Sequence, residues 1–507
     1  MNRRLLVFFL IIGVCIISVH PALSDVILFP LFGDNAVLQR DVKIPVWGTA
    51  SSREKVTVKI DKTIASSIAD ENGKWQVILP EHKAGGPYEI QVSGINTIII
   101  KDIYFGDVWV AAGQSNMAMT VSSSNNAEEE IKQATNSLIR EFHVLSSVAN
   151  EPTQIIRGSW KVCNSNTVAR FSATAYFFAK NLQPELSIPI GIINSSVGGT
   201  RIEAWMSKNA IEKIPELKAE IQLQDKSIQE YKAAVEEYNR KLEQWQEETK
   251  KAKIEGSPAP EKPMPPKSPL NPNSYSVLYN GMVAPFVKFP VKGILWYQGE
   301  ANTGKNVYLY RILLSSLIDD WRNAWKQKIP FIFVQLPNMG RPVETYENNN
   351  WAVLRESQFD VLKKPETAMA VTIDIGEAGN IHPGNKQDVG KRLALAALGV
   401  VYKKKIEYSG PLYAGMNIES NKIRIRFNHV DGGLFAKESE YIQGFVIAGS
   451  DKIFVKAQAK IEGDTVLVWS DNIKEPIAVR YGWAGNPVCN LYNKAGLPTS
   501  PFRTDNW

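Results

Sequence analysis

The sequence contains few residues of the kinds that build disulfide scaffolds, metal sites or nucleic-acid surfaces. It has 3 cysteines and 5 histidines among 507 residues, and its formal net charge is only +6. Cys163 and Cys489 lie beyond the N-terminal segment, and two cysteines do not make a disulfide-dependent scaffold. Whether they pair stays open, with buried free thiols as the favoured interpretation. The sequence has no His or Cys cluster with metal-ligand spacing, no glycine-rich phosphate loop and no concentrated positive charge. We therefore expect no cofactor, no metal and no nucleic-acid partner.

Long apolar runs are also scarce, and the N-terminal one is short. Asn2-Arg-Arg4 precedes the apolar stretch Leu5 to Val19, which is less than the roughly 20 residues that a spanning helix needs. The small-residue site Ala22-Leu-Ser24 follows, so the pattern predicts a secretory signal peptide over residues 1–24. A retained anchor is the alternative. We expect a secreted or periplasmic protein without membrane contact after cleavage; the sequence does not indicate an oligomeric state.

Three regions are predicted from the hydrophobic patterns. Residues 25–103 contain short alternating runs such as Lys55 to Ile60, which are typical of a β-sandwich. Residues 104–404 alternate apolar strands with helix-like segments, which indicates an α/β region. Residues 405–507 return to a β pattern, as in Thr465 to Trp469, and predict a second β domain.

One insertion, residues 207–273, interrupts the α/β region. Apolar residues recur at a spacing close to 3.5 between Ile214 and Trp245, with Glu and Lys between them, which predicts a long helix. The favoured interpretation is an amphipathic helix lying on the core, and the alternative is a projecting arm. The proline-rich segment from Ser257 to Pro272 predicts an extended return strap.

Four predicted strands each end in polar residues, and this pattern places a site at one edge of the sheet. The strands are residues 107–112, 188–194, 291–297 and 368–374. The first leads into Gly113-Gln-Ser-Asn-Met117, which makes Ser115 the candidate nucleophile, because open α/β sheets carry their chemistry at the carboxyl ends of strands. The alternative is that Ser115 caps the following helix.

These blocks resemble the SGNH hydrolase superfamily and, more closely, its sialate O-acetylesterase branch. The similarity rests on Gly-Gln-Ser-Asn-Met at 113–117, Gly-Gly-Thr at 198–200, Gln-Gly-Glu-Ala-Asn at 298–302 and Ile-His-Pro at 381–383, in that order. It implies an SGNH-hydrolase-like α/β core with a parallel sheet, flanked by β-sandwich elements at both ends. It also implies an esterase that removes O-acetyl groups from sialic acid or related acetylated glycans. An acetylxylan esterase of the same fold and a non-catalytic glycan-binding protein are the alternatives.

The resemblance implies roles for the residues of these blocks. Ser115 is the expected nucleophile, and His382 is the expected base, on a loop ahead of the helix-like segment Lys386 to Val400. The oxyanion hole is expected from the amides of Ser115 and Gly199 and the side chain of Asn302.

The acid that orients the histidine is less defined by the sequence. Many SGNH enzymes place an aspartate three residues before the histidine, where this chain has Gly379. Glu300 is the preferred substitute, Asp374 is the alternative, and a backbone carbonyl is the third option.

Three residues near the expected oxyanion donors are candidates for substrate binding. Gln298 and Arg201 are close to the donors in sequence, and the guanidinium of Arg201 suits either a sugar carboxylate or an ion pair with Glu203. Trp205 is the aromatic residue that we expect to stack on a sugar ring, although most aromatic residues of the chain are expected in the core.

Overall fold

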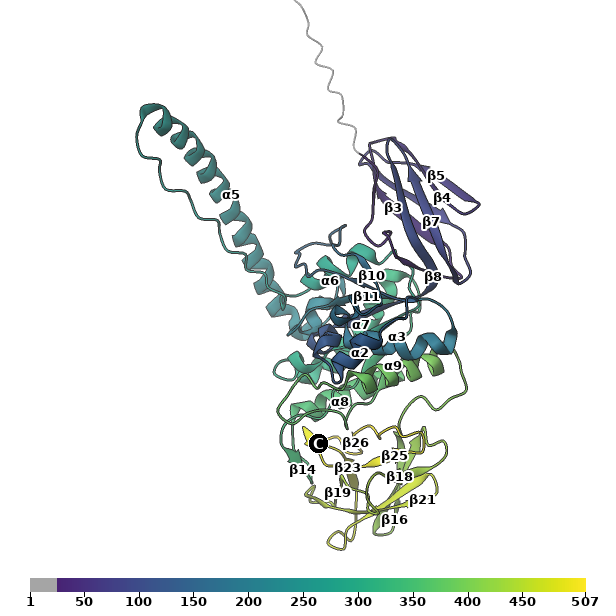
Figure 1. Cartoon of the computed structure of the whole chain (residues 1–507). Helices are drawn as coiled ribbons and strands as arrows, with labels where there is room; N and C mark the ends of the chain where they lie inside the picture. The colour runs from purple at the N-terminus through teal and green to yellow at the C-terminus, as the bar shows by residue number, and fades with distance from the viewer. Residues whose placement is uncertain (1–24) are drawn as a thin grey trace, which may run out of the picture.

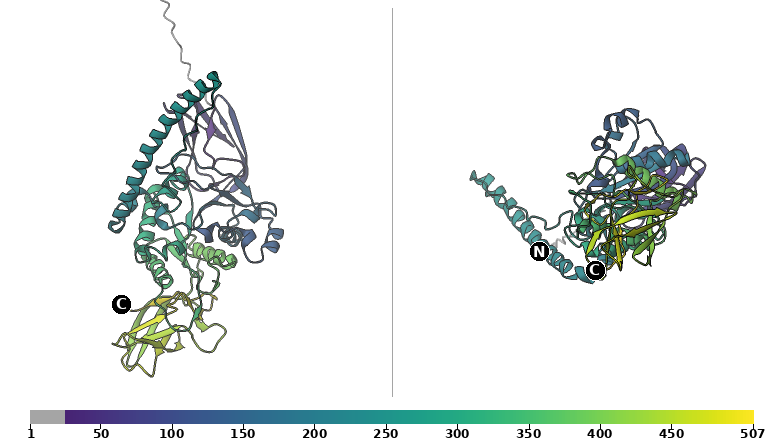
Figure 2. Two further views of the ribbon diagram at one scale, coloured as in Figure 1. Left: turned by 90° about the vertical axis from the view of Figure 1, so that its left-hand side faces the viewer. Right: turned by 90° about the horizontal axis from the view of Figure 1, so that it is seen from below.

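The computed structural model describes residues 25–507, and the signal peptide predicted for residues 1–24 lies outside the described residues. A β-rich N-terminal region leads into an α/β region, and a second β-rich region follows (Figures 1 and 2). The α/β class with additional β-sheets is therefore confirmed. Within residues 25–507, no helix combines the length and the apolar character needed to cross a membrane.

The N-terminal region consists of strands whose side chains alternate between core and solvent. In β4, Val56, Val58 and Ile60 are buried whereas Lys55 and Lys59 are exposed, which is the period of two of a strand with one buried face. β8 pairs with β7 here and then continues into the α/β region, so the predicted boundary after residue 103 falls within one strand. The strands are β1 (Ile27–Leu28), β2 (Val37–Gln39), β3 (Ile44–Thr49), β4 (Lys55–Ile60), β5 (Thr63–Ile68), β6 (Lys74–Leu79), β7 (Gly85–Ser93) and β8 (Thr97–Gly113).

The α/β region is built on parallel strands in the order β9-β11-β8-β12-β13-β15, with β10 antiparallel at the edge. After β8 the chain adds strands first on one side of it and then on the other. This reversal leaves a crevice beside the carboxyl end of β8, where open α/β sheets bind ligands. The strands are β9 (Ile139–His143), β10 (Trp160–Val162), β11 (Ile190–Ser196), β12 (Gly293–Tyr297), β13 (Phe331–Val334), β14 (Pro342–Val343) and β15 (Thr367–Ala370).

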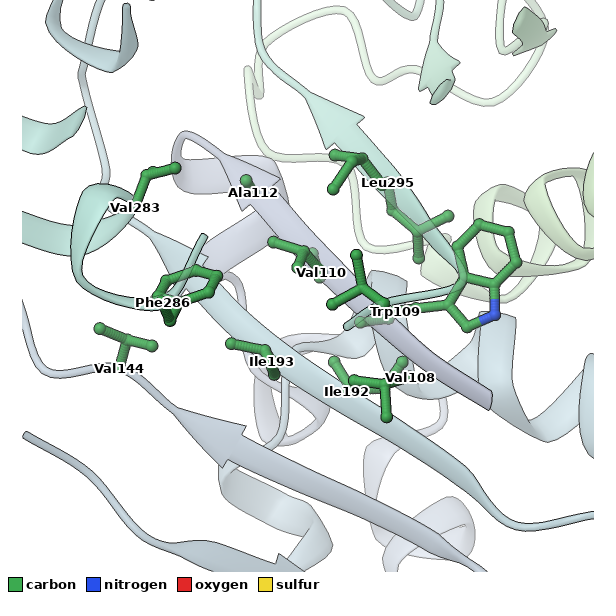
Figure 3. Packing of buried hydrophobic residues seen from close by; sticks show 14 of the residues in the cluster. Val108, Trp109, Val110, Ala112, Val144, Ile192, Ile193, Val283, Phe286 and Leu295 are labelled. Carbon is green, nitrogen blue, oxygen red and sulfur yellow. The ribbon is translucent and has the colours of Figure 1, made fainter. Parts of the chain in front are cut away.

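Helices cover both faces of this sheet. Trp109 of β8 contacts Phe178 of α3 with ring centroids 5.0 Å apart, and Trp296 of β12 contacts Trp321 of α7 at 6.0 Å. Trp296 pairs with Ala112, three residues after Trp109, so the two tryptophans point to opposite faces. Figure 3 shows apolar side chains of β8, β11 and β12 in the core between these layers. The helices are α1 (Ser115–Ala118), α2 (Ala127–Gln133), α3 (Ala173–Leu186), α4 (Lys208–Ile211), α6 (Val277–Met282), α7 (Tyr310–Trp325), α8 (Asn350–Asp360) and α9 (Lys386–Val400).

The insertion contains α5 (Lys218–Glu255), a helix of 38 residues that projects from the α/β region (Figures 1 and 2). The predicted helix is confirmed, but the favoured expectation that it lies on the core is wrong. Beyond Ile228 none of its residues joins the apolar core of the α/β region, and Trp245 contacts the returning strap. The indole of Trp245 donates to the carbonyl of Pro260 at 2.8 Å, and the ammonium of Lys262 lies 5.6 Å from the Trp245 ring.

The C-terminal region forms a second β domain with its own cluster of buried apolar residues. Cys489 packs beside this cluster and Cys163 lies in the α/β core, and both are free thiols. The strands are β16 (Leu412–Glu419), β17 (Lys422–Asn428), β18 (Leu434–Ala436), β19 (Phe445–Ala448), β20 (Phe454–Lys456), β21 (Gln458–Glu462), β22 (Thr465–Trp469), β23 (Ala478–Tyr481), β24 (Asn486–Pro487), β25 (Leu491–Asn493) and β26 (Phe502–Arg503).

A buried arginine joins this domain to the α/β region. Arg355 on α8 is fully buried, and its guanidinium donates to the carbonyls of Leu336, Pro337, Ala484 and Gly485 at 2.7–2.8 Å. Burial lowers the pKa of Arg355 to about 9. The carbonyls of Leu336 and Ala484 have no other donor within residues 25–507, whereas those of Pro337 and Gly485 also accept from Trp351 and from the Met339 amide.

We predict that Arg355→Met destabilises the protein by more than about 2 kcal/mol, because it leaves buried carbonyls without donors. Thermal unfolding followed by circular dichroism measures this as a lower Tm. Arg170→Met is the matched control, since Arg170 is exposed, and surface changes usually stay within about 0.5 kcal/mol. Equal Tm values for the two variants would contradict the role of Arg355.

Candidate active site

Ser115 leaves the sheet at the carboxyl end of β8. Gly113, the last residue of that strand, has a φ of +135°, and a Cβ there would lie 2.1 Å from the carbonyl oxygen of Tyr297. Only glycine fits this close approach of β8 to β12. Ser115 then opens α1, and its hydroxyl makes no capping bond, because Gln114 occupies the N-cap position. The interpretation of Ser115 as a helix cap is therefore wrong.

His382 reaches Ser115 from the loop between β15 and α9. Its Nε2 lies 2.7 Å from Oγ of Ser115, across 267 residues of sequence. The loop is fixed by Asn380, whose side chain accepts from the His382 amide at 2.9 Å and donates to the His382 carbonyl at 3.0 Å. Glu377 accepts from the amide of Gly384 at 2.7 Å and from Asn380 at 3.0 Å, which closes the turn around the histidine. The arrangement presents a serine hydroxyl to an imidazole nitrogen that is held in place.

The carboxylates expected beside the histidine are elsewhere. Asp374 forms an ion pair with Arg392, with distances of 2.6 and 2.8 Å, and accepts from the hydroxyl of Tyr492 at 3.0 Å. Glu300 is buried and bonds to Asn116. Within residues 25–507, His382 Nδ1 has no hydrogen-bond partner, so neither carboxylate nor a backbone carbonyl completes a triad here. The expectation that Glu300 or Asp374 directly contacts His382 is not met in this structure.

Glu300 instead belongs to a buried network behind the nucleophile. Oε1 of Glu300 accepts from Nδ2 of Asn116 at 2.5 Å, and this nitrogen also donates to the carbonyl of Ile381 at 3.0 Å. Oδ1 of Asn116 accepts from Nζ of Lys386 at 2.8 Å. Asn116 therefore connects a carboxylate and an ammonium to the residue that precedes His382.

Burial shifts the pKa of the charged members of this network. Burial raises the pKa of Glu300, against the hydrogen bond from Asn116 and the charge of Lys386. Burial lowers the pKa of Lys386 to about 8, although Glu300 and Glu377 oppose the shift. The pKa of His382 is lowered, first by burial and then by the nearby charge of Lys386. The histidine is consequently neutral at lower pH than a free imidazole, which suits a proton acceptor.

The three expected oxyanion donors lie on segments that follow β8, β11 and β12. The amide of Ser115 is at the start of α1, where helix N–H groups have no intrahelical partner. Gly198 lies against Ser115, since a Cβ on it would be 3.6 Å from the serine Cβ, and Gly199 follows with a φ of +70°. Asn302 is fixed by Glu203, which accepts from its Nδ2 at 3.0 Å, and by Gln298, which donates to its Oδ1 at 2.8 Å. One hydrogen of the Asn302 amide group remains uncommitted.

The candidate substrate residues divide into one that is accessible and two that are not. Arg201 is half-buried, and its guanidinium donates to the carbonyl of Asn273 at 3.1 Å instead of pairing with Glu203. Gln298 is fully buried and bonds to Gln114, Thr200 and Asn302. Trp205 is also fully buried. The expectation that Trp205 stacks on a sugar is wrong, because the residue has no exposed surface, and the Gln298 amide group donates to Asn302, which is equally buried.

Several site residues were not singled out in the sequence. Asn116 follows Ser115 in the block at 113–117, and Lys386 is the first residue of the predicted helix 386–400. No pattern in the sequence indicated a role for either residue. Asn273, at the end of the insertion, accepts from the Arg201 amide at 2.7 Å and donates to the Gly199 carbonyl at 3.0 Å. No sequence pattern links a residue after a proline-rich strap to a loop 74 positions earlier.

We predict that, as the pH rises from about 7 to about 10, the free energy of unfolding of the native chain increases relative to that of Lys386→Met. The folded pKa of Lys386 is about 8, below the ordinary value of 10.5, so the unfolded chain binds more protons in this window. The cost of the buried ammonium is complete below the folded pKa and is lost above it. Denaturant midpoints at several pH values measure the shift.

Lys391→Met is the control for this prediction, because Lys391 is exposed on the same helix. A pH trend of equal size in both variants would refute a special role for Lys386.

Comparisons with known proteins show the family to which the chain belongs. The family model described as "Carbohydrate esterase, sialic acid-specific acetylesterase" matches residues 105–256 and 270–399. The sialate O-acetylesterase of Mus musculus is 29% identical over 94% of this chain and 93% of its own length. That of Rattus norvegicus is 31% identical over 76% of this chain and 75% of its own length.

A solved structure is also similar over almost the whole chain. The crystal structure of a carbohydrate acetylesterase from Xanthomonas citri has 37% sequence identity and a TM-score of 0.81, and covers 95% of this chain and 100% of its own. The family model matches more than half of the chain, and its two segments contain Ser115, Gly199, Asn302 and His382. The chain therefore belongs to the sialate O-acetylesterase family of carbohydrate esterases.

Proposed function

We propose that this protein is a secreted or periplasmic serine esterase that hydrolyses O-acetyl groups on sialic acid or related acetylated glycans. The observation that carries the proposal is the 2.7 Å distance between Oγ of Ser115 and Nε2 of His382 at the carboxyl edge of a parallel sheet. The order of its four polar blocks supports an SGNH-type core. The N-terminal pattern of residues 1–24 supports export.

In the proposed reaction, His382 acts as general base for Ser115. Nε2 takes the hydroxyl proton while Oγ attacks the acetyl carbonyl carbon, so an uncharged nucleophile becomes reactive at neutral pH. The lowered pKa of His382 keeps Nε2 unprotonated and able to accept this proton. The resulting imidazolium then gives the proton to the sugar oxygen as the carbon–oxygen bond breaks.

The oxyanion donors stabilise both tetrahedral intermediates. The amides of Ser115 and Gly199 and the Asn302 side chain donate to the carbonyl oxygen as it becomes negative, and one such donor is typically worth about 2.7–4 kcal/mol in the transition state. Water, deprotonated by His382, then attacks the acetyl-serine. Collapse of the second intermediate releases acetate and restores the Ser115 hydroxyl.

We assign Glu300 a positioning role instead of direct contact with His382. Its support is the bond to Asn116, which also bonds to the carbonyl of Ile381, directly before the histidine. The negative charge of Glu300 also favours the charged form of Lys386, because it raises the pKa of that ammonium. This arrangement sets the position of the His382 loop through Asn116.

We expect Ser115→Ala and His382→Ala each to lower kcat by roughly 10⁴-fold or more, because neither group activates ester attack alone. Acetate release from O-acetylated sialosides and O-acetylated xylo-oligosaccharides, together with 4-nitrophenyl acetate, measures the loss and identifies the preferred glycan. The double variant should lose no more than either single variant, since the two residues act as one unit.

Ser165→Ala is the control for these variants, as Ser165 is an exposed serine outside the site. Turnover by Ser115→Ala at the rate of this control would refute the assigned nucleophile.

We expect Glu300→Gln to lower kcat by about ten- to a hundredfold with little change in KM, because small displacements of a catalytic group cost rates of this order. Glutamine keeps an oxygen for Asn116 but removes the charge that faces Lys386. Asp374→Asn should lower Tm and leave kcat near native, since Asp374 bonds to Arg392 and Tyr492.

A loss of about 10⁴-fold in Glu300→Gln would instead place the carboxylate directly on the imidazole. Native kcat in this variant would argue against any role of the network in catalysis.

A further inference from the structure

One cavity of the protein is lined by residues outside the serine site. It has a volume of about 550 Å³ and is lined by residues near the start of α7, by α8 and by the C-terminal β domain. None of its lining residues belongs to the serine site described above. Figure 1 shows α8 lying between the sheet and the C-terminal domain.

The cavity has aromatic walls held by arginines. The guanidinium of Arg480 is 4.2 Å from the ring centroid of Phe454 and 5.3 Å from that of Tyr346. Arg503 stacks on Trp483 at 4.9 Å. These stacks fix the ring planes before any ligand arrives, because a planar guanidinium over a ring is attractive and directional.

The arginine charges in these walls are already neutralised. Arg480 makes two hydrogen bonds to Asp505, at 2.8 and 2.7 Å, and Arg503 makes two to Glu356, at 2.7 and 3.0 Å. Arg311 bonds to Asp360 at 3.3 Å. An anionic ligand would have to compete with these carboxylates, so the arginines favour a neutral ligand. The remaining lining cation, Lys452, has its ammonium 4.9 Å from the centre of the Trp507 ring.

Polar side chains in the same cavity are uncommitted. The side chains of Asn348, Ser357 and Asn506 and the hydroxyls of Tyr308 and Tyr346 line it, and none has a hydrogen-bond partner within residues 25–507. Amides and hydroxyls both donate and accept, which matches the hydroxyl groups of a sugar. The rings of Tyr308 and Trp507 are also accessible, with 76% and 39% of each residue exposed.

We propose that this cavity binds a neutral oligosaccharide segment of the glycan whose acetyl groups are removed at Ser115. The apolar C–H faces of pyranose rings suit the electron-rich faces of aromatic rings, and the free amides and hydroxyls suit their rims. The volume is within the range of about 300–1,000 Å³ of small-ligand sites. The identity of the glycan rests on the proposed function, whereas binding itself does not.

Isothermal titration of the mature chain with unacetylated xylohexaose, cellohexaose and mannohexaose tests the proposal without requiring catalysis. At least one should bind, and Tyr308→Ala and Trp507→Ala should each weaken that binding at least about tenfold. Tyr441→Ala is the matched control, because Tyr441 lies in the C-terminal domain outside the cavity and is 77% exposed. Hydrolysis of 4-nitrophenyl acetate should be unchanged in all three variants.

Two outcomes overturn the proposal: no binding of any of the three hexaoses, or equal binding by Tyr308→Ala and Tyr441→Ala. Tenfold tighter binding of sialyllactose than of each hexaose would overturn the assignment of a neutral ligand. If the Ser115 and His382 variants kept their esterase activity and still bound the hexaose, the proposed function would be refuted. The assignment of the cavity would remain intact.

Discussion

The site depends on the register of β8 with its two parallel neighbours. Gly113, at the end of β8, is paired with Ser196 of β11 on one side and Tyr297 of β12 on the other. Three loops therefore leave the sheet at one level and carry Ser115, Gly199 and Asn302 toward the same crevice. A Cβ at Gly113 would collide with the backbone of Tyr297. The close approach of the Ser115 loop to the Asn302 loop therefore requires glycine at position 113. The sheet thus sets the level at which the segments carrying these three residues begin.

The side-chain amide of Asn116, next to Ser115 in the sequence, lies between the buried groups of Glu300 and Lys386. Asn116 donates to Glu300 and accepts from Lys386, so its side chain satisfies an acid and a base at once. Oε2 of Glu300 is buried without a hydrogen-bond partner among the described residues, which leaves the carboxylate half satisfied. Burial raises the pKa of Glu300 and lowers that of Lys386, and each shift favours the neutral form of the group. Through Asn116, this polar network contacts the backbone of the loop that carries His382.

Segments outside the sheet brace the loops of the site. Asn273, where the insertion returns, bonds on both sides of the Gly199 loop. From the C-terminal domain, Asn486 accepts from Asn338 at 2.7 Å, and Asn338 in turn accepts from the amide of Gly376, at the start of the histidine loop. The insertion and the C-terminal domain are therefore connected by hydrogen bonds to the loops that carry Gly199 and His382.

Local pattern in the sequence determined the strands, the helix 386–400, the long helix of the insertion and the polar blocks at the strand ends, because periodicity and composition report which side of an element is apolar. The resemblance carried by those blocks implied the pairing of Ser115 with His382. Only the tertiary structure decided that Trp205 and Gln298 are buried, that Asp374 bonds to Arg392, and that Glu300 bonds to Asn116 instead of His382. It also decided that α5 projects, since the strap covers an apolar stripe that the core was expected to cover. These features depend on partners distant in sequence, and periodicity identifies a buried face without identifying what buries it.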